Sequence, residues 1–133
     1  MQEKQLALVT YEQAKKLKEL GFDWECTAFY DLNENNELDY FANQVDWNNE
    51  VDTLSAPTVA LALKWSREVM GIQYTIEFIE GSGQYECYVY KEFTFIKHNG
   101  NLGISKNAYE AAESALLDTL LEHCEQELKN EKD

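Results

Sequence analysis

Apolar side chains recur at helical spacing most clearly between Asp52 and Gly71, where the pattern predicts one buried helix at about residues 56–70. Ser55 stands at the expected N-cap, and Pro57 falls in the first turn, where its missing N–H has no intrahelical partner to lose. Gly71 can adopt the left-handed conformation that ends a helix. Small and apolar side chains share one stripe: Val59, Ala62, Leu63, Ser66, Val69 and Met70. We therefore expect this helix inside the protein, covering a sheet.

Two further helices are predicted from their end signals and periodicity. Thr10 and Gln13 match a capping box and Gly21 a stop signal, so a surface helix is expected over residues 10–21. A longer helix is expected from about residue 107 or 108 to residue 129, with a broad apolar stripe and acidic residues outside.

The remaining apolar runs predict hairpins. Residues 26–30 and 37–41 are rich in strand formers and flank a polar turn at residues 33–36, whereas residues 42–51 are expected to form a loop. Apolar residues alternate again on both sides of a turn at residues 80–83. Closing Ile79 onto Gln84 there gives three apolar cross-strand pairs: Phe78 with Tyr85, Ile76 with Cys87, and Tyr74 with Val89.

Residues 93–96 continue as a further strand before a turn at residues 98–101. The order α-β-β-α-β-β-α then predicts a single α+β domain over residues 1–133. We expect an antiparallel sheet of four or five strands with three helices mainly on one face. The length suits one domain, and 44% hydrophobic and 13% aromatic residues suit a folded core.

Composition favours a cytoplasmic protein. The three cysteines are odd in number and far apart, which indicates reduced thiols. The N-terminus is polar, and the apolar run at residues 6–9 is too short for a signal peptide or a membrane span. The net charge of −14, from 25 acidic and 11 basic residues, opposes direct binding to nucleic acid or anionic membranes. Residues 22–55 contain nine acidic residues and no Lys or Arg, which favours a basic partner.

No catalytic, metal or cofactor site is predicted. Four oxygen-bearing residues alternate as in a calcium loop, but the Gly and the bidentate Glu of that loop are missing, so a polar turn is favoured: Asp31, Asn33, Asn35 and Glu37. His123, Cys124 and Glu127 supply too few ligands for zinc. All three cysteines fall at apolar positions of predicted elements, where burial raises the pKa of a thiol. Paired carboxylates carry no information in so acidic a chain.

Two surfaces are candidates for binding. The first is the acidic stretch between Asp23 and Asp52, with six candidate residues: Trp24, Asp31, Glu37, Asp39, Tyr40 and Trp47. Its alternative is a solvated acidic surface, and Trp47 itself is expected to tuck its ring onto the core. The second is the strand face that carries Tyr88 and Tyr90, and its alternative is a face covered by a helix or another subunit.

Three stretches, at residues 10–23, 55–68 and 109–122, together resemble small uncharacterised proteins of phages, prophages and mobile elements in Bacteroidetes. The resemblance implies a small cytoplasmic protein encoded by a mobile element, and it transfers no catalytic or binding residue.

We expect a non-enzymatic protein that binds another protein, with a homo-oligomer as one form of that binding. One alternative is an acidic nucleic-acid mimic that inhibits a DNA-binding protein. Another is a small-molecule-binding or enzymatic domain with a pocket between Trp65, the sheet and the last helix.

Overall fold

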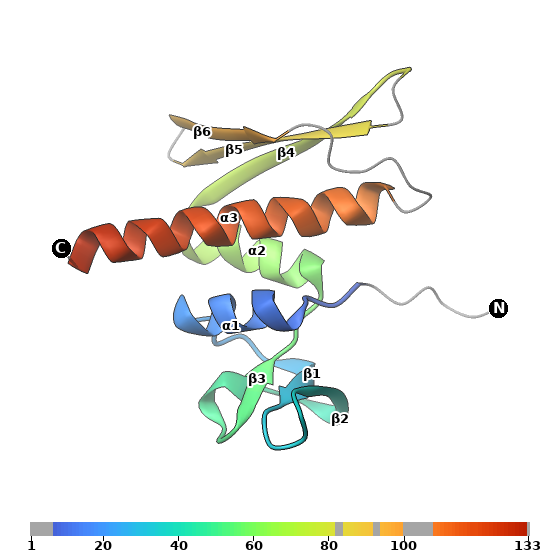
Figure 1. Ribbon diagram of the computed structural model, residues 1–133, viewed down its shortest axis with the longest axis vertical. Coiled ribbons are helices and arrows are strands. Elements are labelled where there is room, and N and C mark those ends of the chain that lie inside the picture. Colours follow the sequence, from blue (N-terminus) through green and yellow to red (C-terminus); the bar gives the residue numbers. More distant parts are fainter. Residues whose placement is uncertain (1–6, 82–83, 92–93, 100–107, 133) are drawn as a thin grey trace.

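The protein has three layers, with helices between two antiparallel sheets (Figure 1). The computed structural model describes residues 7–81, 84–91, 94–99 and 108–132. The helices are α1 (Tyr11–Glu19), α2 (Val59–Val69) and α3 (Ala108–Lys132). The strands are β1 (Cys26–Asp31), β2 (Glu37–Val45), β3 (Thr53–Ser55), β4 (Ile72–Ile79), β5 (Gln84–Lys91) and β6 (Thr94–Asn99). The first sheet has the order β2-β1-β3 and the second the order β4-β5-β6.

The α+β class and the order of the predicted elements are confirmed, but the expectation of one continuous sheet is wrong. Among the described strands, none of the first sheet pairs with any of the second. The helical layer explains the separation, because α2 buries Val59, Leu63 and Trp65, while α3 packs against the other two helices and against β4 and β5. Apolar surface on both sides of a helical layer needs cover on both sides. Each sheet therefore has helices on one face, and those helices lie between the sheets.

The predicted capping box of α1 is confirmed. The Thr10 hydroxyl accepts a hydrogen bond from the Gln13 N–H at 3.1 Å, and Gln13 Oε1 accepts one from the Thr10 N–H at 2.9 Å. Gln13 is also 1% exposed, and its Nε2 donates to Asp118 Oδ1 at 2.9 Å and to the Ser114 carbonyl at 3.1 Å. One side chain therefore caps α1 and joins it to α3.

The structure corrects the start of the central helix. Thr58, not Ser55, is the N-cap of α2, because its Oγ1 accepts from the Leu61 N–H at 3.1 Å. Ser55 instead ends β3 opposite Phe29 and is fully buried. Pro57 precedes the cap and therefore lies outside the first turn. The predicted end is confirmed, since Gly71 has φ +72° directly after the cap at Met70.

Both predicted hairpins form. The three apolar cross-strand pairs expected between β4 and β5 are all present in the predicted register. β6 supplies the further strand and continues through His98 and Asn99, so the prediction of a turn is wrong at these two residues. Phe93 and residues 100–101 lie outside the described residues. In the first hairpin β2 continues to Val45 and is followed by a 3-10 helix, η1 (Trp47–Asn49), so the prediction of a loop over residues 42–51 is wrong there.

Buried side chains of both sheets and all three helices belong to one apolar cluster. Trp65 and Phe22 are its largest fully buried side chains, and their rings meet edge to face at 5.4 Å. This cluster fixes the first sheet against the helices and leaves the outer face of that sheet open.

Candidate functional site

The first sheet carries the strongest candidate surface, and its polar hairpin turn is held by its own side chains. Asp31 Oδ1 accepts from the Asn33 N–H at 3.0 Å, and Asn33 Nδ2 donates to Asp52 Oδ2 at 3.2 Å. Asn35 and Asn36 take left-handed backbone conformations, with φ of 56° and 60°, that asparagine tolerates better than most residues. The sequence pattern that resembles a calcium loop therefore builds a turn.

An aromatic cluster, Phe29, Phe41 and Trp47, lies on the outer face of this sheet. The Trp47 ring stacks on Phe29 at 4.1 Å and meets Phe41 edge to face at 5.8 Å, while its Nε1 donates to the Cys26 carbonyl at 2.9 Å. Trp47 was expected to tuck its ring onto the core, and its ring does pack against the protein, but on the outer face of the first sheet and outside the core cluster. The other two members were not singled out from the sequence, because Phe29 pairs with Asp39 and the irregular register near Phe41 hides the contact.

The segment after β2 is fixed by side-chain hydrogen bonds. Asn48 Nδ2 donates to the Phe22 carbonyl at 2.9 Å, and Asn48 Oδ1 accepts from the Ser55 N–H at 3.0 Å. Thr53 Oγ1 donates to the Trp47 carbonyl at 2.7 Å. These hydrogen bonds hold the backbone beside the aromatic cluster in place, which reduces the entropy lost when a partner binds there.

Strand β2 presents apolar side chains to solvent between carboxylates. Leu38, Tyr40 and Phe41 are 36%, 58% and 51% exposed, and both Glu37 and Asp39 are exposed beside them. The Asp39 carboxylate accepts a hydrogen bond from the Tyr40 N–H at 2.8 Å. Exposed apolar residues gathered on one strand are typical of a contact surface.

The charge of the molecule is polarised along the stack of layers in Figure 1. The nine carboxylates of residues 22–55 all belong to the first sheet and its connections, and most are exposed. Every Lys and Arg of the described residues lies on a helix or on the second sheet. The first sheet is therefore an acidic end with no internal counter-charge.

The predicted site residues fall into two groups that the structure does not bring together. Asp31, Glu37, Asp39, Tyr40 and Trp47 share the first sheet and η1, whereas Tyr88 and Tyr90 lie on β5 in the second sheet. Trp24 lies just before β1, half-buried, with its ring 6.4 Å from Phe22. The two groups are on opposite sides of the helical layer (Figure 1).

Tyr88 and Tyr90 lie on the face of the second sheet that is turned away from the helices. Their cross-strand partners there are Thr75 and Gln73, while Cys87 and Val89 point into the core. The Tyr88 hydroxyl donates to Glu86 Oε2 at 3.0 Å, and this hydrogen bond raises the pKa of Tyr88. No described helix covers this face in Figure 1.

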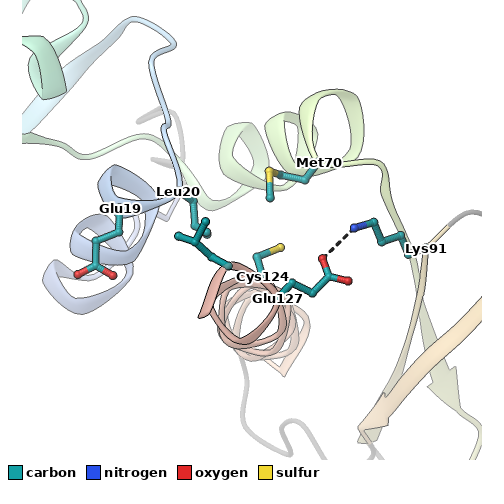
Figure 2. A pocket seen from close by; sticks show the side chains of 7 residues that line it. Glu19, Leu20, Met70, Lys91, Cys124 and Glu127 are labelled. Atoms are coloured by element: carbon teal, nitrogen blue, oxygen red, sulfur yellow. Dashed lines mark hydrogen bonds and ion pairs between the residues drawn. The ribbon is translucent and has the colours of Figure 1, made fainter. Parts of the chain in front are cut away.

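Two hollows accompany these surfaces. The first, of about 170 Å³, lies where α1, α2, α3 and β5 meet, and Figure 2 shows Leu20, Met70 and Cys124 around it. At its edge Lys91 pairs with Glu127 at 2.8 Å, which lowers the pKa of Glu127. The second, of about 160 Å³, lies on the inner side of the first sheet and is lined by Tyr40 and Gln44, among other residues.

The chemistry within reach of the hollows is limited. Cys26, Cys87 and Cys124 are buried free thiols, and burial raises the pKa of Cys87 and of Cys124 to about 11. Burial raises the pKa of Cys26 as well. The prediction that the cysteines behave as buried apolar groups is confirmed, and such thiols are poor nucleophiles at neutral pH.

In the part of the chain that the structure describes, no three His, Cys, Asp or Glu side chains gather in a way that could hold a metal ion. His123 Nε2 lies 3.2 Å from Glu127 Oε1, so these two predicted partners do meet on α3. None of the described helices combines the length and the apolar character needed to cross a membrane. Comparison of the chain with protein-family models, curated proteins and solved structures found no match.

Proposed function

We propose that the protein acts by binding another protein, and that β2, the edge strand of the first sheet, carries the binding surface. The observation that supports this proposal is the combination on β2 of exposed Leu38, Tyr40 and Phe41 with carboxylates that have no basic neighbour on the same sheet. Aromatic side chains supply contact area in protein interfaces, and uncompensated charge attracts a partner of the opposite sign. The partner is therefore a protein with a basic contact region.

A nucleic-acid mimic is the second candidate, and the unbroken acidity of residues 22–55 favours it. The basic partner would then be a DNA-binding protein, and the carboxylates would occupy the positions of phosphates. The two candidates differ in one measurable respect, because DNA competes with a mimic and does not compete with an unrelated interface.

The small-molecule or enzymatic alternative has less support. Trp65, expected as a wall of its pocket, is 1% exposed and packs within the core. The hollow shown in Figure 2 is bordered by a thiol with a raised pKa and by a lysine that is paired with Glu127. A thiol with a raised pKa is a poor nucleophile at neutral pH, and the lysine is held in an ion pair.

Self-association is a further possibility within the same proposal, and it fits the second sheet better than the first. Two copies of the acidic sheet would repel each other, because neither brings a Lys or Arg to the contact. A homo-oligomer would therefore use the face of Tyr88 and Tyr90, away from the helices. We also propose that the protein is cytoplasmic, which the few, dispersed cysteines support, and that a mobile element encodes it, which rests on the resemblance alone.

Affinity capture with matched variants tests the proposed surface. The tagged protein is incubated with lysate of a Bacteroidetes host and washed with increasing salt, beside the double variants Glu37→Gln/Asp39→Asn and Glu68→Gln/Glu122→Gln. Both variants lose the same charge, but Glu68 and Glu122 are exposed on helices away from the first sheet.

We expect a basic protein that wild type and the helix variant retain, that the sheet variant loses, and that elutes as salt screens the contact. Its displacement by duplex DNA would select the mimic. Equal retention by all three proteins, or a partner that resists high salt, would overturn the acidic sheet as the binding surface.

A further inference from the structure

β2 is an edge strand of the first sheet, and none of the described strands lies along the side of β2 that faces away from β1. β1 pairs with β2 on one side and with β3 on the other, and none of the described strands pairs with the far edge of β2. An open edge presents unpaired N–H and C=O groups that can accept another strand.

Hydrogen bonds identify which backbone groups face that edge. The Ala28 carbonyl accepts from the Ala56 N–H at 3.0 Å, so the polar groups of Ala28 are directed toward β3 and away from β2. Tyr40 lies opposite Ala28, and in an antiparallel ladder such a pair directs its backbone groups outward on both strands. The Tyr40 N–H accordingly bonds to the Asp39 carboxylate instead of to β1. Leu38, two residues earlier, faces outward by the same alternation.

We propose that this edge accepts an extended, basic segment of the partner as an added strand. The inference rests on the proposed function, and it names the form in which the partner binds. Charge selects the occupant, because Glu37 and Asp39 flank the outward-facing positions and the first sheet has no Lys or Arg. A second copy of β2 would bring the same carboxylates together, so a basic segment fits the edge and a like copy does not.

Asp39 adds a condition to this binding. Its carboxylate occupies the Tyr40 N–H that an added strand must bond, so the incoming carbonyl has to displace it. A lysine or arginine of the added strand can then pair with the released carboxylate, whereas a neutral strand offers it no such partner. The hydrogen bond between the Tyr40 N–H and the Asp39 carboxylate therefore makes the edge favour basic segments over neutral ones.

The hollow of about 160 Å³ gives one side chain of the added strand a place to lie. A residue directly opposite Tyr40 points to the same face of the sheet, where Tyr40, Leu8 and Leu61 line the hollow together with Glu25. Apolar walls with a carboxylate suit the stem and charged end of lysine or arginine.

A labelled peptide of about ten residues, the length of a strand, tests the inference. It alternates Lys with Val or Thr, and its affinity is measured by fluorescence anisotropy against wild type, Tyr40→Pro and Tyr40→Ala. Proline removes an N–H that does not bond to β1, so the ladder between β1 and β2 is retained, and both variants lose the same ring without changing charge. A second peptide, with its central amides N-methylated, carries the same charge and tests the same bonds on an unaltered protein.

We expect Tyr40→Pro to bind the first peptide at least about tenfold more weakly than Tyr40→Ala, and wild type to prefer the first peptide to the N-methylated one by a similar factor. Equal affinities in both comparisons would overturn strand addition and leave ionic binding by the proposed surface in place. No binding of either peptide would also overturn it, while affinity capture decides the proposed function separately. Dimerisation of the wild type that Tyr40→Pro abolishes would assign the edge to a second copy instead.

Discussion

Single buried polar side chains join elements within the helical layer. Gln13 is the clearest case, because it closes the capping box of α1 and also bonds to α3 across the layer. The capping role follows from the spacing of Thr10 and Gln13 along the chain. The bond to α3 does not, since Gln13 and Asp118 are 105 residues apart in the sequence and no local pattern joins them.

Replacing the buried Gln13 by Ala should destabilise the protein by about 2 kcal/mol, because the Thr10 N–H loses its acceptor and α3 loses its hydrogen bonds to α1. Glu12→Ala is the matched control on the same turn, where the side chain is exposed and forms a surface ion pair with Lys15. It should cost less than about 0.5 kcal/mol. Urea unfolding followed by circular dichroism measures both, and equal losses would show that Gln13 has no structural role beyond the helix surface.

The ion pair of Glu127 with Lys91 makes a pH-dependent contribution. Lys91 lowers the pKa of Glu127 below its usual value of 4.5, so the pair stabilises the fold above that pH and the contribution disappears as Glu127 becomes protonated. Glu127→Gln should therefore be less stable than wild type by about 0.5 kcal/mol at pH 7, and the difference should vanish well below pH 4.5. Thermal unfolding across this range, with Glu122→Gln as the exposed control, measures it. A difference that is independent of pH would contradict the assignment.

The sequence signals for helix ends located the end of α2 correctly, where the chain turns sharply. They were less accurate at the start of α2, where a strand leads almost directly into the helix. Gly71 ends α2 as expected because a positive φ favours glycine. Ser55 is of a residue type that favours the N-cap position, but it pairs with Phe29 of β1 and is the last residue of β3. Three residues are too few to show alternation, so the sequence alone could not separate this strand from the first turn of α2.

Thr58→Ala should destabilise the protein by about 1 kcal/mol, because the Leu61 N–H loses the Oγ1 that caps it. Ser55→Ala should cost less than Thr58→Ala, since the buried Ser55 hydroxyl caps no helix and interacts only weakly with the Cys26 thiol. Thr58→Ser keeps the cap and serves as the control. Chemical denaturation distinguishes the two caps, and a larger loss at position 55 than at position 58 would contradict the observed start of α2.

For the whole molecule, the sequence predicted the helices, the two hairpins and their order, but not η1, β3 or the division into two sheets. Local hairpin registers follow from alternation, as the pairs between β4 and β5 show. Which sheet a hairpin joins depends on long-range packing against α2 and α3, and no periodic pattern in the sequence reveals that packing. The acidic stretch was visible in composition, whereas its distance from Tyr88 and Tyr90 follows from the layered fold.

The proposed binding of a basic segment at the open edge of β2 changes the environment of specific backbone amides. Amide hydrogen exchange by NMR tests it directly, with the protein alone and with the alternating Lys peptide. We expect slower exchange at the outward-facing amides of Leu38 and Tyr40, and little change at Asp39, whose backbone faces β1. Binding of the peptide with exchange unchanged on β2, or slowed only at Tyr88 and Tyr90, would contradict the account and move the binding surface to the second sheet.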